Sequence, residues 1–203
     1  PSSALCECPV VSRRASGWPV LAAAYCPPLG ARLGVKGRVV GESIRCPFHG
    51  WRYGTDGMCE HIPYSDEIPD RARLRTWHCE EKNGEVYIWF HRENTGPQWE
   101  LPSLPELGHP DWTSPRYTEF LVPAHVQDIA ENSCDPVHFQ FVHKMEDVPP
   151  SEVTIDADGR TLHLHSDAEQ SGVSTHLHAT VYSPGFAMVR NTYAPGAEMV
   201  MYN

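Results

Sequence analysis

Cys46-Pro47-Phe48-His49-Gly50-Trp51 is the stretch of this 203-residue chain that says most about its fold. It places a thiol and an imidazole three positions apart in a loop rich in glycine and proline. Twenty positions before it, Cys26-Pro27-Pro28-Leu29-Gly30-Ala31 has the same composition. Two loops that carry soft ligands can hold one metal centre between them. The pair of loops therefore indicates a metal-binding domain.

The composition narrows the class of protein around these loops. Seven cysteines at irregular spacing argue against a closed disulfide framework, so we expect a cytoplasmic or other reducing compartment. A formal charge of -10 excludes nucleic acid as a partner, because phosphate binding needs clustered Lys and Arg. The chain starts at Pro1 without a signal-peptide pattern and ends directly after an apolar stretch. We therefore expect a fragment of a longer protein, whose association with a membrane is not visible in this stretch.

The residues around the loops predict a small antiparallel β domain. Short β-prone runs flank tight turns at Gly41-Glu42 and at Thr55-Asp56-Gly57, and residues 86–90 read as a strong strand. Five prolines between residues 97 and 115 then predict an extended connector that resists helix formation.

In the second half of the chain the spacing of apolar residues changes from a helical pattern to the alternation of a strand. Residues 124–132 have helical composition, and Asp135-Pro136 predicts a new helix start, with Asp as N-cap and Pro at the first helical position. Beyond residue 150 apolar residues alternate, as at Leu162 and Leu164, which predicts an antiparallel sheet with one apolar face.

The two loops resemble the cluster-binding loops of Rieske non-heme iron oxygenases. That family has a Cys-x-His loop followed by a Cys-x-x-His loop, in which two Cys hold one iron of a [2Fe-2S] cluster and two His hold the other. The resemblance implies that Cys26, Cys46 and His49 bind the cluster. It fails at Pro28, which stands where the family has histidine and has no side-chain donor.

Position 28 leaves several alternatives open. We expect a weak or absent cluster and no turnover in the chain as written. Four other residues could replace the missing ligand, although their spacing in the sequence does not match a known ligand pattern. They are Cys59, His61, Cys6 and Cys8. The other interpretations are buried thiols of an ordinary β domain and a zinc site on Cys26, Cys46 and His49, although structural zinc prefers four ligands.

A second constellation lies at Glu131-Asn132-Ser133-Cys134-Asp135-Pro136-Val137-His138, which continues to His143. Residues five apart on an ideal helix differ by about 140°, so the rings of His138 and His143 converge only if the helix bends or ends between them. Two neutral His and one carboxylate form a facial triad that leaves positions open on Fe(II).

The segment also resembles the family's mononuclear iron motif, Glu-Asn-x-x-Asp-x-x-His-x-x-x-x-His. The resemblance implies that His138 and His143 bind iron, that Asp135 bridges the cluster of one subunit to the iron of its neighbour, and that Asn132 lies close to the iron. The third ligand is not identified. The available carboxylates read better as surface groups; they are Asp156, Asp158, Asp167 and Glu169.

The stretch between the two constellations looks most like the steroid-acting branch of the family, the 3-ketosteroid 9α-hydroxylases and cholesterol 7-desaturases. The resemblance implies an α+β fold: a Rieske domain over residues 1–100, a connector over 101–118, and the first half of a helix-flanked catalytic domain over 119–203. It implies hydroxylation or desaturation of a hydrophobic substrate with O2. It also implies that electrons come from NAD(P)H through a ferredoxin or flavin reductase and that the intact protein is a homotrimer. The alternatives are a catalytically inactive remnant and a non-catalytic zinc-binding module.

Four further histidines could face each other across a hairpin, in His163-Leu164-His165 and His176-Leu177-His178. We favour an interpretation in which Leu164 and Leu177 point inward and the histidines line the polar face of the sheet, over one in which they bind a metal.

Overall fold

The structure is a computed structural model that describes residues 9–93, 95–170, 172–194 and 196–202. The chain divides into two compact units, residues 1–116 and 117–203, and each is described by itself. Cys6 and Cys8, two of the suggested substitute ligands, lie outside the described residues.

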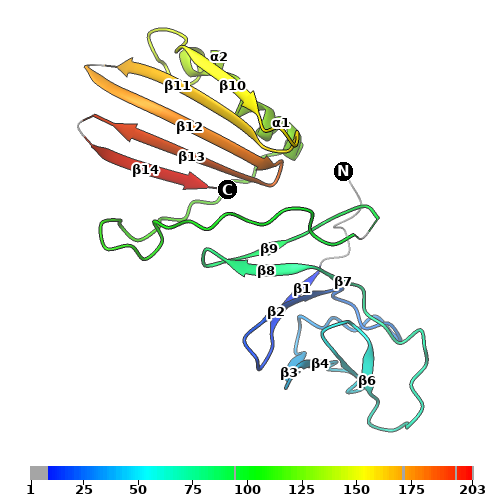
Figure 1. Ribbon diagram of the computed structural model, residues 1–203. Helices are drawn as coiled ribbons and strands as arrows, with labels where there is room; N and C mark the ends of the chain where they lie inside the picture. Colours follow the sequence, from blue (N-terminus) through cyan, green and yellow to red (C-terminus); the bar gives the residue numbers. More distant parts are fainter. Residues whose placement is uncertain (1–8, 94, 171, 195, 203) are drawn as a thin grey trace. The chain divides into compact units, whose positions relative to one another are not determined.

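The first unit is built from three small antiparallel sheets (Figure 1). One has the order β1-β2-β7, with bounds Val10–Arg13, Pro19–Ala22 and Thr76–Trp77. The second has the order β3-β4-β5-β6, with bounds Arg38–Val40, Ser43–Arg45, Arg52–Tyr53 and Cys59–His61. A separate ribbon pairs β8, Cys79–Lys82, with β9, Glu85–Ile88.

Both predicted turns of this unit are present. Gly41 joins β3 to β4 with a φ of 59°, a left-handed conformation that glycine adopts without strain. Gly57 has a φ of 80°, and a Cβ there would meet the carbonyl oxygen of Leu74 at 2.2 Å. Glycine is therefore required at position 57 by both its own backbone conformation and the close approach of the Leu74 carbonyl.

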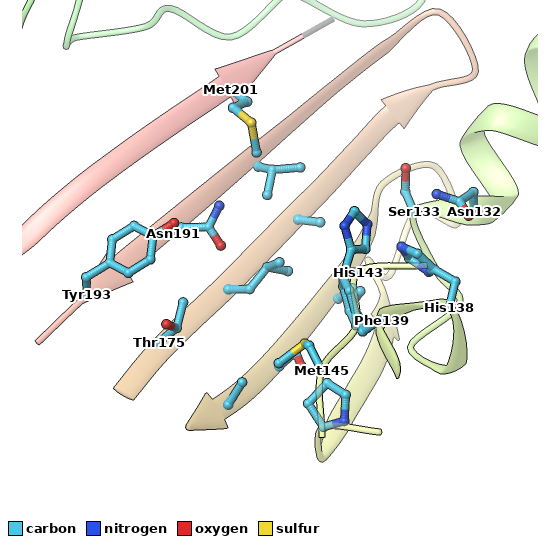
Figure 2. A pocket seen from close by; sticks show the side chains of 17 residues that line it. Asn132, Ser133, His138, Phe139, His143, Met145, Thr175, Asn191, Tyr193 and Met201 are labelled. Carbon is cyan, nitrogen blue, oxygen red and sulfur yellow. The ribbon is translucent and has the colours of Figure 1, made fainter. Parts of the chain in front are cut away.

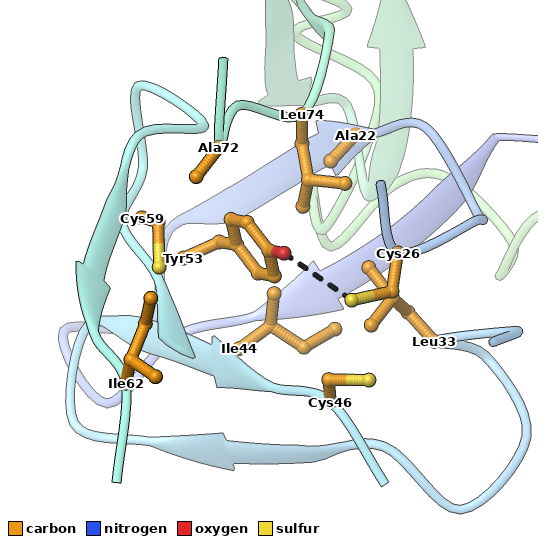
Figure 3. Packing of buried hydrophobic residues seen from close by; sticks show 10 residues of the cluster. All are labelled: Ala22, Cys26, Leu33, Ile44, Cys46, Tyr53, Cys59, Ile62, Ala72 and Leu74. Atoms are coloured by element: carbon orange, nitrogen blue, oxygen red, sulfur yellow. Dashed lines mark hydrogen bonds between the residues drawn. The ribbon is translucent and has the colours of Figure 1, made fainter. Parts of the chain in front are cut away.

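The core of the first unit surrounds Tyr53, whose side chain is fully buried (Figure 3). Leu33, Ile44 and Leu74 pack in the same cluster together with Cys26 and Cys46. Because the β4 and β5 strands carry Ile44 and Tyr53 into this core, the loop that joins them is held at both of its ends.

The second unit is one antiparallel sheet in chain order, with two short helices against it (Figure 1). The helices are α1, Val126–Asn132, and α2, Val137–Phe141. The strands are β10, Ser151–Ile155; β11, Leu162–Gln170; β12, Val173–Ser183; β13, Phe186–Tyr193; and β14, Ala197–Tyr202. The α+β expectation is confirmed in part, because the described chain is mostly β with helices of seven and five residues.

The alternation along β11 and β12 gives the sheet two different faces, as the sequence predicts. Leu164 pairs with Ala179 and Ser166 with Leu177, so these residues share one face. His165 pairs with His178 on the other face. Leu164 is 1% exposed, which makes its face the core side of the unit.

Candidate metal centres

The two loops of the first unit have the same backbone geometry. In each loop the cysteine N–H donates to the carbonyl five residues later, Cys26 to Ala31 at 2.9 Å and Cys46 to Trp51 at 2.8 Å. In each the cysteine carbonyl accepts from the glycine four residues later, Gly30 or Gly50. Both glycines have positive φ, 67° and 76°. Cys26 and Cys46 therefore occupy equivalent positions in two loops of the same backbone conformation.

The two cysteines lie together at the edge of the buried cluster (Figure 3). Cys26 is 4% exposed and Cys46 is 1% exposed. The Cys26 Sγ lies 3.2 Å from the Tyr53 hydroxyl. Burial, opposed by the Tyr53 hydrogen bond and assisted by the neighbouring Cys46 and Cys59, raises the pKa of the Cys26 thiol to about 12. Without a bound cation Cys26 is therefore a thiol, and a metal must displace its proton to bind.

Of the four positions at which the resemblance expects cluster ligands, three carry a side chain with a donor atom. Phe48, 62% exposed, lies beside His49 in the second loop, with ring centroids 4.1 Å apart and the ring planes tilted by 34°. Pro28 is exposed at the corresponding position of the first loop and has no donor to offer. The fourth ligand position therefore does not fit the cluster.

Cys59 does not replace the missing ligand. Its side chain lies on the other side of the Tyr53 ring from Cys26 and Cys46 (Figure 3). His61, at the end of the same strand, is exposed. Among the residues that the structure describes, no three or more His, Cys, Asp or Glu side chains are grouped so that they could hold a metal ion.

His138 and His143 are brought together by the end of helix α2. The helix stops at Phe141, and the backbone turns at Lys144 with a φ of 61°. The ring centroids of His138 and His143 are 5.1 Å apart, in an edge-to-face arrangement. The condition set by their spacing, a helix that ends between them, is therefore met.

The surroundings of His138 select one of its ring nitrogens for a metal. Its Nδ1 contacts the backbone carbonyl oxygen of Asp135. A ring that donates from Nδ1 to a carbonyl keeps Nε2 as the free lone pair, which is the usual arrangement of a metal-binding histidine. The two imidazoles could thus supply two of the three protein ligands of a ferrous ion. Among the described residues, no carboxylate is placed with them as the third ligand.

Asp135 and Asn132 flank the histidine pair from the segment that joins the two helices. The expected start of α2 is wrong by one residue, because Pro136 is the N-cap and the helix begins at Val137. Asp135 still caps the helix, because its Oδ1 accepts a hydrogen bond at 2.8 Å from the N–H of Val137, which has no partner within the helix. Asn132 is the last residue of α1 and lines the same hollow as His138.

A cavity of about 390 Å3 lies between the helical segment and the sheet of the second unit (Figure 2). The helical side contributes Asn132, Ser133, His138, Phe139, His143, Met145 and Pro149. The sheet contributes every second residue of three strands, namely Leu164, Ser166, Ala168, Thr175, Leu177, Ala179, Val189, Asn191 and Tyr193, with Met201 from β14. The lining is mainly apolar, and both imidazoles stand at one side of it.

Asn191 is one of the polar residues in the sheet lining, together with Ser166, Thr175 and Tyr193. Its residue is 6% exposed, and its amide makes no hydrogen bond within the described part of the chain. Ser166, by contrast, accepts a hydrogen bond from Ser151 at 3.0 Å. The side chain of Asn191 stands from β13 toward the cavity (Figure 2). Sequence analysis missed this residue, although the alternation of the strands carries the signal that places it on the apolar face.

The four extra histidines lie on the other face, as the favoured interpretation predicts. His165 and His178 stack with centroids 4.1 Å apart, and the His163 Nε2 lies 3.2 Å from Asp156. Burial lowers the pKa of His178, and His165, His163 and Arg190 lower it further. Asp167 contacts His176 at 2.6 Å. These contacts place Asp156 and Asp167 with the outer histidines.

Family models match both parts of the chain. The 3-ketosteroid 9α-hydroxylase C-terminal domain matches residues 88–201, and the Rieske [2Fe-2S] domain matches residues 5–77.

Curated relatives include cholesterol 7-desaturase nvd of Xenopus laevis, 45% identical over 121 residues that cover 59% of this chain and 27% of the relative. The 3-ketosteroid-9-alpha-monooxygenase oxygenase component of Mycolicibacterium smegmatis is 37% identical over 123 residues, 59% of this chain and 32% of the relative. The chain thus spans about a third or less of the length of these relatives.

Solved structures share the fold. NdmA of Pseudomonas putida CBB5 with caffeine aligns with a TM-score of 0.74 and 21% identity, over 96% of this chain and 59% of that one. Dicamba monooxygenase bound to dicamba aligns with a TM-score of 0.73 and 18% identity, over 97% of this chain and 67% of that one.

Proposed function

Because this chain belongs to the 3-ketosteroid 9α-hydroxylase C-terminal domain family, with a Rieske domain preceding that match, we propose that it is part of a Rieske oxygenase acting on steroids or sterols. In this proposal the whole protein is the oxygenase component, which hydroxylates or desaturates its substrate with O2. The proposed activities are those in the names of its relatives, which include a cholesterol 7-desaturase and a 3-ketosteroid monooxygenase.

The observation that carries the proposal is the apolar cavity with two imidazoles at its side. Its volume of about 390 Å3 lies within the range of small-molecule sites, roughly 300–1,000 Å3. Leu164 and Leu177 exclude water from one wall, and His138 and His143 stand at another. A rigid, mostly apolar molecule with few oxygen atoms suits such a lining.

We assign roles to the residues around the cavity as follows. His138 and His143 hold Fe(II), which supplies when bound the redox chemistry that dioxygen requires. The carbonyl of Asp135 fixes the proton of His138 on Nδ1, so that Nε2 points its lone pair to the metal. Asn132 lies beside the pair, and the Asp135 carboxylate is the link to a neighbouring subunit.

The first unit is proposed to receive the electrons, and its cluster site is incomplete. Cys26, Cys46 and His49 fit three ligand positions, whereas Pro28 does not fit the fourth. No catalytic step is therefore derived through the cluster. Pro28 is the observation that favours the alternative of an inactive remnant of the family.

The remaining parts of the proposal concern the assembly. We propose a Rieske domain over residues 1–100, a connector over 101–118 and a partial catalytic domain over 119–203, in a homotrimer that takes NAD(P)H-derived electrons from a ferredoxin or flavin reductase. A reducing compartment suits the free thiols Cys26, Cys46 and Cys59. None of the described helices is long and apolar enough to cross a membrane.

Steroid binding tests the proposal without requiring a complete cluster. Titration calorimetry of the purified protein with a 3-ketosteroid should give saturable binding. Leu177→Asp places a charge in the cavity lining and should weaken the binding at least tenfold. Val153→Asp introduces the same charge on the edge strand β10, where the side chain is 46% exposed, and should leave it unchanged. Equal affinity of both variants, or no binding by the wild type, would contradict the proposal.

A further inference from the structure

Two of the four histidines on the outer face of the second unit's sheet meet in the structure, in contact with a threonine. His163 of β11 lies opposite Thr180 of β12, and His178 is the neighbour of Thr180 on the same face of β12. The His163 Nδ1 lies 3.1 Å from the His178 Nε2. The Thr180 Oγ1 lies 3.4 Å from the first of these nitrogens and 3.3 Å from the second. Three donor atoms from two neighbouring strands therefore form one small triangle.

The dimensions of this triangle suit a transition-metal ion. Zinc binds imidazole nitrogen at about 2.0–2.1 Å, and tetrahedral geometry then separates two of its ligands by roughly 3.3–3.4 Å. The three sides of the triangle, 3.1, 3.3 and 3.4 Å, are close to that separation. One ion placed just above the triangle would contact all three atoms and keep a fourth position for water.

The carboxylate of Asp156 prepares His163 for this role. Its Oδ1 lies 3.2 Å from the Nε2 of His163, which is the ring nitrogen outside the triangle. A neutral imidazole carries its proton on one nitrogen, and the carboxylate holds that proton on Nε2. The lone pair of Nδ1 is therefore free for the other atoms of the triangle. A carboxylate that fixes a histidine in this way is a common partner of a metal-binding imidazole.

The triangle is held in place by its surroundings. Thr180 is 3% exposed, and the His163 side chain is 22% exposed. The ring of His165 stacks on that of His178 with the planes 18° apart, a contact that restricts rotation of the His178 ring. Because the donor atoms are already ordered, little conformational entropy is lost when an ion binds.

The donor set consists of two imidazoles and a hydroxyl. The fourth outer histidine, His176, is held elsewhere by its 2.6 Å contact with Asp167. The set agrees with the finding that no three His, Cys, Asp or Glu side chains are grouped around a possible ion in the described part of the chain. We therefore expect weaker binding than at a structural zinc site, which has four protein ligands.

We propose that His163, His178 and Thr180 bind a divalent transition-metal ion, with Zn2+ as the expected ion. Zn2+ exceeds Fe(II) in affinity for nitrogen ligands, and the set lacks a carboxylate. In the metal-free protein the proton on the His178 Nε2 is donated to the His163 Nδ1. The ion replaces that proton, and His178 then carries its proton on Nδ1. The inference is independent of the proposed function, because none of the three residues lines the cavity.

Nuclear magnetic resonance of the wild-type protein, labelled with nitrogen-15 in its histidine rings, tests the assignment directly. Titration with Zn2+ should shift the resonances of the His163 Nδ1 and the His178 Nε2 and leave those of the His176 ring in place, and EDTA should reverse the shifts. Because each signal belongs to one ring, zinc bound by His138 and His143 does not obscure the result.

Single substitutions give the quantitative comparison. In calorimetric titration with Zn2+, His178→Ala should lose one equivalent of bound zinc or bind it at least tenfold more weakly than the wild type. His176→Ala is the matched control, on the same strand and the same face, and should bind zinc as the wild type does. Unchanged His163 and His178 resonances in the wild type at excess zinc would overturn the inference, and so would equal zinc binding by the two variants.

Discussion

Replacing Asn191 with leucine should stabilise the second unit and weaken substrate binding. The residue is 6% exposed, and its amide borders the cavity without a hydrogen bond to any described residue. A fully buried polar group without a partner costs about 1–3 kcal/mol, which is the upper bound for an amide that faces a cavity. Leucine would lie directly opposite Leu177 in the sheet, with apolar contacts in place of the amide. We therefore expect the free energy of unfolding to rise, by at most about 3 kcal/mol.

The same substitution removes one of the polar groups that the cavity offers to a steroid oxygen. One neutral hydrogen bond is worth about 0.5–1.5 kcal/mol, which corresponds to a roughly two- to twelvefold increase in Kd. Calorimetric unfolding measures the first effect and steroid titration measures the second. Stabilisation combined with weaker binding is the signature of a polar group kept for its ligand.

A satisfied asparagine provides the contrast. The Asn83 amide donates to Pro102 at 2.9 Å and accepts from the Leu104 N–H at 3.0 Å, and its backbone has a φ of 54°. Asn83→Leu should therefore destabilise the first unit. If Asn191→Leu also lowers stability, the amide is satisfied in the folded protein and the reasoning about the cavity is wrong.

Three further changes test other parts of the molecule. His138→Ala should remove Fe(II) binding measured by anaerobic titration, whereas His176→Ala, on the outer face of the sheet, should leave it unchanged; iron retained by His138→Ala would contradict the assigned ligand. Pro28→His should increase the iron and acid-labile sulfide retained after reconstitution, because it adds the missing donor at an exposed loop position, and equal cluster content in both proteins would refute that view of position 28. Burial, followed by nearby His165, His163 and Arg190, lowers the pKa of His178 in the folded state, so the unfolded state binds its proton more readily. That contribution to stability is complete above the ordinary histidine pKa of about 6.5 and is lost as pH falls through the folded pKa, and His178→Gln should flatten this part of the curve of unfolding free energy against pH.

Local patterns predicted much of the fold. Glycines at positions 41 and 57 mark real turns because each adopts a positive φ that few other residues tolerate. Alternation around Leu164 and Leu177 predicted the inner face of the sheet, since side chains in a strand point to opposite faces with a period of two. The histidine pair was also recognisable, and its convergence followed from a helix that ends at Phe141.

The features that depend on pairing between strands were not predictable. Arg38, Arg45 and Arg52 lie in one row across the sheet only because the registers of two strand pairs, β3-β4 and β4-β5, align them. Their spacing of seven residues in the sequence does not reveal that alignment. Asn191 was missed for a related reason, because its isolation depends on which groups of neighbouring strands reach it. The segment expected as a strand over residues 86–90 is shorter, ending at Ile88 in a two-stranded ribbon.

The most direct test of the account is whether one site holds both iron and steroid in the second unit. The protein is loaded anaerobically with Fe(II), nitric oxide is added as a spectroscopic probe, and the electron paramagnetic resonance spectrum is recorded with and without a 3-ketosteroid. The account predicts a ferrous nitrosyl signal that changes shape when the steroid binds and that is absent from His138→Ala. A signal that is identical with and without bound steroid would contradict the claim that His138 and His143 hold iron beside the substrate cavity.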